Sequence, residues 1–278
     1  MNAIAKDAIL TPPRYRCAEV LCAVRANDVV NTDYRLLTLD APPEVLECAP
    51  GQFFQLLCPG TADDQPFLRR PMSIYDFDAQ AGSLRFLYKV TGAGTRGLAT
   101  LRPGDRLNVL GPLGQGFSMH DNWQRLMLVA RGVGLATLAP LARLAQARGR
   151  QLTAICSARA PEFVMSVEHF RNCGAEVIVV TDTDGSSAPD ALHALIEARI
   201  ASGGVDAFYT CGSARIARML QGIGAAHGIP GEIAVEQQMA CGLGMCQACV
   251  RPFRDGDKVV HRRVCREGPV FPLAGVVA

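Results

Sequence analysis

The sequence predicts a mixed α/β chain in three parts: an antiparallel β-barrel, an α/β domain on a parallel sheet, and a small C-terminal lobe. Three observations predict this division. Short strand-like segments separated by Pro, Gly, Asn and Asp fill residues 14–118. Apolar strands alternate with Ala- and Leu-rich helical stretches over 119–228. Residues 229–278 lose this periodicity and hold four of the 11 cysteines.

Composition and charge exclude several classes of protein. Of the 278 residues, 49% are hydrophobic and 19% are charged, which suffices for a packed core and excludes a disordered chain. Lys and Arg number 28 against 26 Asp and Glu, so the net charge of +2 predicts no nucleic-acid partner. The longest apolar run, 132–142, is well short of the roughly 18 residues that a membrane span requires.

The first 13 residues, which end in Pro12-Pro13, are expected to form a mobile tail. Its apolar segment, 8–10, is too short for a secretory signal, so we expect a cytoplasmic protein. Cysteines in that compartment seldom form disulfides. Seven cysteines lack metal-like spacing and are expected as small buried side chains. They are Cys17, Cys22, Cys48, Cys58, Cys156, Cys173 and Cys211.

The first domain, 14–118, is expected to be a closed or sandwiched antiparallel sheet, because many short strands follow one another within about 95 residues. The predicted strands are 19–24, 34–39, 52–57, 72–77, 84–90 and 106–110. Residues 111–117, Gly-Pro-Leu-Gly-Gln-Gly-Phe, are rich in turn formers and lead out of the domain.

The second domain, 119–228, is expected to be a nucleotide-binding sheet with crossover helices. The predicted strands are 125–130, 152–157, 177–181 and 207–210, and the predicted helices are 135–146, 192–201 and 214–226. The segment from 229 onward has few periodic apolar positions. It therefore needs something other than a hydrophobic core to hold it together.

The cysteines of the last part show the spacing C-x4-C-x2-C, then fifteen residues, then C. The first three reproduce the plant-type spacing of 2Fe-2S ligands, in which a fourth thiolate comes from a distant segment. Gly242 and Gly244 permit the positive φ angles of a tightly curled loop, whose backbone N–H groups can face the sulfurs. The predicted metal ligands are Cys241, Cys246, Cys249 and Cys265.

Zinc is the competing metal for these four cysteines. Structural zinc sites usually pair two short Cys knuckles, whereas Cys265 stands alone, so the spacing favours 2Fe-2S. Asp255-Gly256 predicts a hairpin that returns Cys265 to the other three.

Two stretches of the first domain carry candidate ligand-binding residues. Arg70-Pro71-Met72-Ser73 joins a guanidinium, a rigid Pro and a hydroxyl at the start of a predicted strand; alone it could equally be a surface Arg before an edge strand. Leu87-Tyr88-Lys89 leads to a Gly-rich loop with Gly94 and Thr95. That loop could admit a phosphate to its backbone amides, or be an ordinary turn.

Two junctions of the second domain run from a strand to a helix. Gly132 and Gly134 lie where a helix N-terminus would receive a pyrophosphate, although a lone G-x-G is a weak signal. Cys211 ends another strand before Ser213, a plausible N-cap. The thiol either packs in the core or lines a ring-binding pocket.

Together these motifs resemble the electron-transfer subunits of NAD-linked dihydroorotate dehydrogenase, members of the ferredoxin reductase superfamily. The resemblance runs from Cys17 to Pro272. It rests on the order of five segments: Leu-Arg-Arg-Pro-Met-Ser-Ile at 68–74, Gly-Thr at 94–95, 111–117, Met-Ala-Cys-Gly-Leu-Gly-Met-Cys-Gln-Ala-Cys at 239–249, and Val-Cys-Arg-Glu-Gly-Pro-Val-Phe at 264–271.

The resemblance implies FAD in the barrel, NAD(P)H in the α/β domain and a 2Fe-2S cluster in the lobe. Arg70, Pro71, Met72 and Ser73 would hold FAD, with the guanidinium on the pyrophosphate and the Ser73 hydroxyl near the reactive edge of the isoalloxazine. Leu87, Tyr88 and Lys89 would form a second stretch of the site, and Gly94 and Thr95 would contact its phosphates. Gly132 and Gly134 would bind the nicotinamide nucleotide. Ser73 and Cys211 are the candidate catalytic residues.

The resemblance therefore implies an oxidoreductase that passes electrons between NAD(P)H and a partner flavoprotein subunit within a hetero-oligomer. The partner that it implies first is a dihydroorotate dehydrogenase of pyrimidine biosynthesis. Two alternatives stay open: a reductase component that serves an oxygenase or another dehydrogenase, and a non-enzymatic zinc module. Relatives usually carry glycines before the G-x-G and a Pro in the following helix. Here Ala130-Arg131 and Thr137 stand at those places, and Arg131 could contact a phosphate or crowd the pocket.

Overall fold

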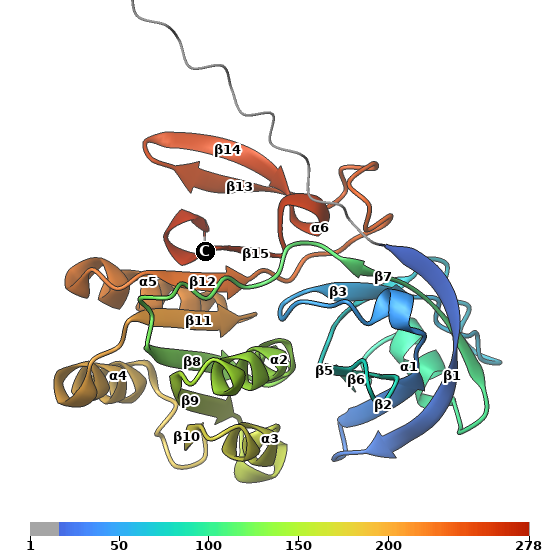
Figure 1. Cartoon of the computed structure of the whole chain (residues 1–278), viewed down its shortest axis with the longest axis horizontal. Coiled ribbons are helices and arrows are strands. Elements are labelled where there is room, and N and C mark those ends of the chain that lie inside the picture. Colours follow the sequence, from blue (N-terminus) through green and yellow to red (C-terminus); the bar gives the residue numbers. More distant parts are fainter. Residues whose placement is uncertain (1–16, 278) are drawn as a thin grey trace, which may run out of the picture.

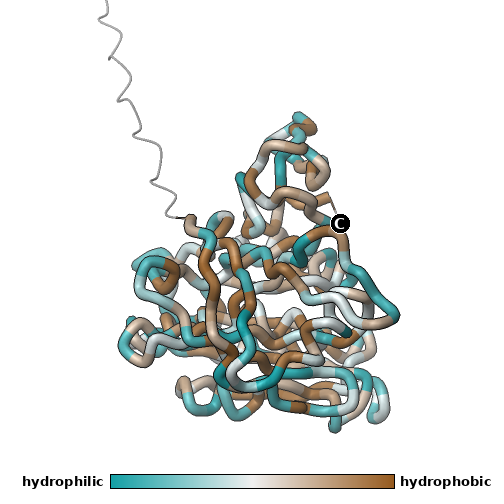
Figure 2. Tube along the Cα trace, turned by 90° about the vertical axis from the view of Figure 1, so that its right-hand side faces the viewer, coloured by the Kyte–Doolittle hydropathy of each residue, from teal (hydrophilic) through white to brown (hydrophobic). Residues whose placement is uncertain are grey.

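The computed structural model describes residues 17–277. Figure 1 shows a curled sheet on the right, a second sheet flanked by helices on the left, and a β-hairpin above the second sheet. Hydrophobic stretches follow the strands of both sheets, and hydrophilic stretches follow the outer turns (Figure 2). The predicted mobile tail, 1–13, lies outside the described residues.

The first sheet has seven antiparallel strands among the described residues, in the order β4-β3-β7-β1-β2-β6-β5. These strands are β1 (Ala18–Val29), β2 (Tyr34–Asp40), β3 (Phe53–Leu56), β4 (Arg70–Ser73), β5 (Asp76–Asp78), β6 (Ser83–Lys89) and β7 (Arg106–Leu113). A short 3₁₀ turn, η1 (Pro43–Val45), and helix α1 (Ala93–Ala99) complete this part.

Chain connectivity forces this sheet to curl. A flat sheet of this size would hold its edge strands about 29 Å apart, at about 4.8 Å per strand. The edge strands β4 and β5 are joined only by Ile74 and Tyr75, which reach at most about 11 Å. Ile74 donates its N–H to the carbonyl of Gln52 beside β3 at 3.1 Å, and the next residue, Tyr75, donates to the carbonyl of Arg85 on β6 at 2.9 Å. The predicted antiparallel barrel is thus confirmed as a curled sheet whose edges meet through the chain.

The barrel interior is filled by side chains from alternate strand positions. Phe54 and Phe86 pack edge to face with ring centroids 5.7 Å apart, and both are fully buried. Tyr88 places its hydroxyl within the same core and donates to Asn27 at 3.0 Å. These contacts fix β3 against β6, and with them the two stretches that hold the candidate binding residues.

The predicted strands of the first domain are all present, with one split and one added helix. The expected strand 72–77 is two strands, β4 and β5, because the chain crosses from one sheet edge to the other there. The expected Gly-rich loop at 92–95 begins α1 instead. The backbone N–H groups of Thr91 and Gly92 donate to the Thr95 hydroxyl at 2.9 and 3.0 Å, which caps the helix.

The second sheet has six strands within the described residues, in the order β10-β9-β8-β11-β12-β15. All pairs are parallel except β12 with β15. The strands are β8 (Arg125–Arg131), β9 (Gln151–Ala158), β10 (Glu176–Thr181), β11 (Ala207–Cys211), β12 (Gly231–Ala234) and β15 (Val270–Pro272). The helices are α2 (Gly134–Ala147), α3 (Val167–Asn172), α4 (Pro189–Gly203) and α5 (Ala214–His227), with the 3₁₀ turn η2 (Pro161–Phe163). All seven predicted elements of this domain are confirmed.

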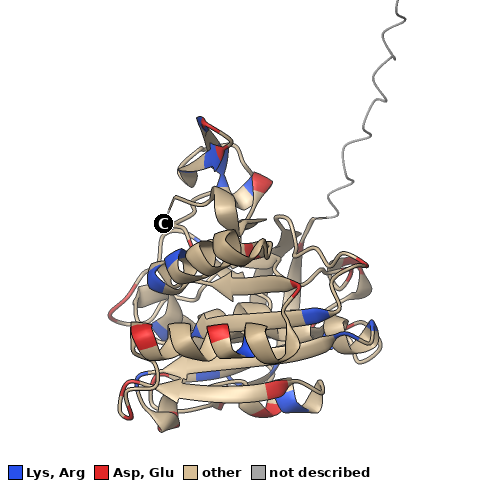
Figure 3. Cartoon of the chain, turned by 90° about the vertical axis from the view of Figure 1, so that its left-hand side faces the viewer, with Lys and Arg blue, Asp and Glu red and all other residues tan. Residues whose placement is uncertain are grey.

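Helices cover both faces of this sheet, as its apolar strands require. Leu128 of β8 points to the face that α2 and α3 cover, and its neighbour Val129 points to the face of α4 and α5. Ser213 caps α5 as predicted, since its hydroxyl accepts from the N–H of Ile216 at 3.3 Å. Acidic and basic residues are interspersed over the outer side of this domain (Figure 3), as expected for a net charge of +2.

The C-terminal part is built into the second sheet at both ends. The chain leaves β12, forms the cysteine loop and the hairpin of β13 (Val250–Asp255) and β14 (Lys258–Arg263), and returns as β15, which pairs with β12. The short helix α6 (Val264–Glu267) precedes β15, and the 3₁₀ turn η3 (Leu273–Gly275) follows it. The Asp255-Gly256 hairpin is confirmed. The division after residue 228 stays a prediction, and two strands beyond it belong to the second sheet.

The two large parts pack through an apolar contact and an ion pair. Tyr75 and Leu87 of the first part pack on Ala136 and Ala139 of α2. Nearby, the Arg143 guanidinium of α2 bonds the buried carboxylate of Asp76 at 2.7 Å. Within the described residues, no helix combines the length and the apolar character that crossing a membrane takes.

Removing the Arg143 guanidinium should loosen this contact between the parts. Of the cationic partners in residues 17–277, Arg143→Met leaves the buried Asp76 carboxylate only the Arg85 guanidinium, 3.7 Å away. We expect a loss of about 1–3 kcal/mol in the free energy of unfolding, measured by chemical denaturation.

A matched control is Arg171→Met, which removes an exposed pair with Glu168 and should cost about 0.5 kcal/mol or less. Adding Asp76→Asn to Arg143→Met should recover part of the loss. Equal effects of the two Arg substitutions would contradict the assignment of Arg143 to the interface.

Candidate functional site

A cavity of about 1060 Å³ lies where the three parts of the chain meet. Its walls come from β4 and the end of β6, the first turns of α2, the carboxyl ends of β11 and β12, and segment 235–240 after β12. In the second sheet β8 is flanked by β9 on one side and β11 on the other, so the strand order reverses beside this cavity. Such switch points are where open α/β sheets bind ligands.

The structure places nearly all of the residues predicted to hold FAD at this cavity. Its lining includes Arg70, Pro71, Met72, Ser73, Leu87, Tyr88, Lys89 and Thr95. Gly94 is not part of the lining but supports it. A Cβ at Gly94 would come within 2.8 Å of the Arg70 side chain. The absence of a side chain at Gly94 therefore leaves the space that the Arg70 side chain occupies. Their roles toward a flavin stay predictions.

Two neighbouring arginines line the cavity, and they differ in whether a carboxylate pairs with the guanidinium. The guanidinium of Arg69 bonds Glu19 at 2.6 Å and the backbone carbonyl of Gln55 at 3.3 Å. The guanidinium of Arg70 donates only to the backbone carbonyls of Leu68 and Arg69 among the described residues. Arg70 therefore keeps its positive charge available for an anionic group, as a pyrophosphate contact requires.

On the nucleotide side, the G-x-G glycines shape the junction without lining the cavity. Gly132 has φ +56°, and a Cβ at Gly134 would lie 2.6 Å from the carbonyl oxygen of Cys211. The absence of a side chain at Gly134 lets α2 start close against β11. Val133 and Thr137 then reach the cavity wall. Nucleotide binding by Gly132 and Gly134 stays a prediction.

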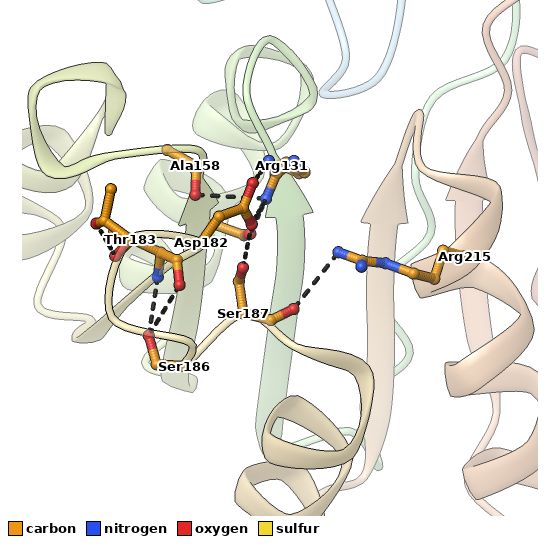
Figure 4. Close-up of polar contacts among 9 residues, drawn as sticks. Arg131, Ala158, Asp182, Thr183, Ser186, Ser187 and Arg215 are labelled. Atoms are coloured by element: carbon orange, nitrogen blue, oxygen red, sulfur yellow. Dashed lines mark hydrogen bonds and ion pairs between the residues drawn. The ribbon is translucent and has the colours of Figure 1, made fainter.

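The Arg131 guanidinium is not part of the cavity lining. It bonds residues at the carboxyl edge of the second sheet (Figure 4). It donates to both carboxylate oxygens of Asp182, at 2.9 and 2.6 Å, and to the hydroxyl of Ser157 at 3.2 Å. Hydrogen bonds from Arg131 and Ser187 lower the pKa of Asp182 to about 2. Arg131 is thus held by its own chain and does not crowd the cavity.

Cys211 and Glu236 come together at the carboxyl ends of β11 and β12. Both line the cavity, and burial raises the pKa of the Cys211 thiol to about 12, so the thiol is neutral and not a nucleophile. Desolvation at the cavity wall also raises the pKa of the Glu236 carboxyl, although this side chain stays exposed at the cavity. The sequence interpretation missed Glu236. The available signal was an acidic residue directly after a short apolar segment, at an edge where strands end.

Three of the predicted metal ligands, Cys241, Cys246 and Cys249, lie in the loop before β13, and Cys265 lies in α6; together they form two pairs. Cys241 interacts with the Cys246 side chain, and the backbone N–H of Cys265 donates to the Cys249 sulfur at 3.4 Å. Cys249 and Cys265 are buried, whereas Cys246 is exposed. Across residues 17–277, no three His, Cys, Asp or Glu side chains stand ready as a complete metal site. The role of the four as ligands therefore stays a prediction.

The loop around Cys241 nevertheless suits an anionic iron-sulfur centre. Burial would raise the pKa of this thiol, but hydrogen bonds from the backbone N–H groups of Cys246 and Leu243 outweigh it and lower the pKa to about 6. Gly242 and Gly244 have φ angles of +71° and +82°, which turn the backbone N–H groups inward. The buried Gln55 carboxamide, packed against Gly242, has no partner among the described residues.

Family models match both halves of this site. Residues 21–117 match the oxidoreductase FAD-binding domain, and residues 236–277 match the iron-sulfur cluster binding domain of dihydroorotate dehydrogenase B. The second match includes all four predicted ligands, so it supports iron and sulfide over the zinc alternative.

Similar proteins agree with these matches. The electron transfer subunit of dihydroorotate dehydrogenase B (NAD(+)) of Desulforamulus reducens is 32% identical over 89% of this chain and 93% of its own length. That of Caldanaerobacter subterraneus subsp. tengcongensis is 35% identical over 80% of this chain and 84% of its own.

Solved structures share the fold. A chain of an NADH-dependent reduced ferredoxin-NADP oxidoreductase aligns with TM-score 0.72 and 24% identity over 91% of this chain and 88% of its own. The ferredoxin reductase in carbazole 1,9a-dioxygenase aligns with TM-score 0.61 and 19% identity over 77% and 67%. The predicted ferredoxin reductase-like architecture is confirmed. With a barrel that matches an FAD-binding domain and a cysteine loop that matches an iron-sulfur domain, this chain belongs to the family of dihydroorotate dehydrogenase B electron transfer subunits.

Proposed function

We propose that this chain relays electrons from NAD(P)H through FAD and a 2Fe-2S cluster to a dihydroorotate-oxidising flavoprotein subunit, or in the reverse direction. One observation carries the proposal: the cavity that β4 lines is closed on its other side by Met239, Ala240 and Ala248. Ala240 and Ala248 directly precede Cys241 and Cys249. The candidate flavin site and the candidate cluster site therefore share a wall.

When bound, FAD would exchange electron pairs with the nicotinamide and single electrons with the cluster. The protein supplies position and charge. Arg70 would neutralise the pyrophosphate, and the Ser73 hydroxyl would lie at the flavin edge. Cys211, as a neutral thiol, would provide a compact apolar wall, and Glu236 beside it would bind the polar end of the nicotinamide.

The tip of the cysteine loop is placed to reach a partner. Met245 is 81% exposed, Leu243 is 45% exposed and Cys246 is exposed, while Cys249 and Cys265 are buried. An exposed apolar tip beside one ligand and a protected interior around the others suits a hetero-oligomer in which electrons leave through this loop. None of the 11 cysteines forms a disulfide, which agrees with the cytoplasmic location that we propose.

Replacing a buried cysteine should remove the cluster and spare the flavin. Cys265→Ser is expected to abolish the visible absorption and the bound sulfide of a 2Fe-2S centre, because serine is a poor substitute for a thiolate ligand. Flavin absorption should persist, since the FAD site is built mainly from β4 and β6. Cys156→Ser, in the core of β9, is the control. Wild-type protein that holds zinc without sulfide would contradict the proposal.

Arg70→Met should weaken FAD binding roughly 10- to 100-fold, the effect of losing one charge-assisted hydrogen bond pair. The dissociation constant can be measured by quenching of flavin fluorescence. Arg69→Met is the matched control, because the Arg69 guanidinium is already paired with Glu19. Similar losses in both variants would contradict the assignment of the pyrophosphate to Arg70.

Glu236→Gln should slow reduction of bound FAD by NADH at least tenfold, because the carboxyl would orient and polarise the nicotinamide. Rapid-mixing absorption under anaerobic conditions gives the rate. FAD content and cluster content should be unchanged. Glu232→Gln serves as the control, because that carboxyl accepts from Ser118, away from the cavity. An unchanged rate in Glu236→Gln would remove this residue from the proposed site.

A further inference from the structure

Gln55 is a fully buried polar residue whose side chain has no hydrogen-bond partner among the described residues. Both its amide nitrogen and its amide oxygen are inaccessible to solvent, and neither is bonded. A carboxamide buried in this way costs about 1–3 kcal/mol relative to a bonded one. Native proteins rarely leave such a group unpaired without a reason.

Strand alternation turns Gln55 toward the C-terminal part. Its neighbours on β3, Phe54 and Leu56, point into the barrel core. Phe53 points the other way and packs in the cluster of side chains that includes Cys249 and Cys265. Gln55 is two residues from Phe53 and so shares its face.

On that face, Gln55 contacts the first turn of the cysteine loop. A Cβ at Gly242 would come within 2.8 Å of both the Cγ and the amide nitrogen of Gln55. The glycine therefore lets the carboxamide approach the backbone directly beside Cys241. The same loop already aims the backbone N–H of Leu243 at the Cys241 sulfur, at 3.3 Å.

We propose that the Gln55 carboxamide donates a hydrogen bond to a sulfur of the 2Fe-2S centre, and that Gln55 thereby ties the cluster loop to the flavin-binding sheet. This inference rests on the proposed function and names a positioning residue that neither the sequence motifs nor the family matches identify. Its physical basis is that the side chain is buried, unpaired and adjacent to a ligand. A thiolate or sulfide is the acceptor that this position offers.

Hydrogen bonds to cluster sulfurs stabilise the more negative, reduced state and raise the reduction potential. Loss of the Gln55 donor should therefore make the cluster harder to reduce. We expect about a fivefold change in the equilibrium constant for one-electron reduction, which is about 40 mV at 59 mV per tenfold.

The test compares Gln55→Met with the wild-type protein, both purified without oxygen. Met has nearly the same length as Gln and no donor. We expect iron, sulfide and FAD contents to be retained, and the cluster potential, followed by electron paramagnetic resonance during a redox titration, to fall by the stated amount. An unchanged cluster potential overturns the inference.

Gln52→Met is the matched control, because the Gln52 carboxamide already donates to the carbonyl of Gly114 at 2.9 Å and accepts from the N–H of Ala49 at 2.8 Å. It should leave the cluster potential unchanged. An equal fall in both variants would show a general effect of loosening this region and overturn the inference.

A direct readout covers the case in which Gln55→Met fails to bind a cluster. Wild-type protein labelled with ¹⁵N only in glutamine side chains should show a hyperfine coupling between the reduced cluster and an amide nitrogen. Its absence in cluster-loaded wild type overturns the proposal for Gln55 alone. Wild type without iron and sulfide overturns the proposed function instead.

Discussion

The pairing of β15 with β12 is the constraint on which the site depends. The chain leaves the second sheet after Ala234 and returns at Val270, which lies opposite Ala234 in the antiparallel pair. Both ends of the excursion that carries the four cysteines are thereby anchored to one strand. A loop with little core of its own is held in place against the barrel, and its inner residues close the cavity that β4 opens.

The charged side chains around the cavity are of two kinds: those paired with other residues of the chain and those free to contact a bound cofactor. Arg69 and Arg131 are paired with carboxylates, and so contribute to the structure of their own sheets. Arg70 faces the cavity without an ion pair among the described residues, and the Glu236 carboxyl lines the cavity beside Cys211. Among the residues that the structure describes, the cavity thus combines one available cation, one carboxyl of raised pKa and mainly apolar walls, which is the usual composition of a cofactor site.

Much of this arrangement could be predicted from the sequence, and the exceptions have physical causes. Most strands and helices of the two sheets followed from local periodicity and turn residues, whereas β12, β15 and α3 were not predicted. Arg70 to Ser73 reached the cavity as expected. Helix α1 was missed because the capping hydroxyl of Thr95 is hidden in a glycine-rich stretch. Gln55 was missed because its importance comes from burial against a segment far away in sequence, and Glu236 because its importance comes from its place in the cavity wall. Strand alternation alone could not show that Gly242 would pack on Gln55.

The central claim is that one chain holds a two-electron and a one-electron carrier side by side. Its most direct test is an anaerobic titration of the purified chain with NADH, followed by absorption and electron paramagnetic resonance. The account predicts uptake of three electrons per chain, with flavin bleaching and the signal of a reduced 2Fe-2S cluster rising together. Uptake of two electrons with no cluster signal, in protein shown to contain iron and sulfide, would contradict it.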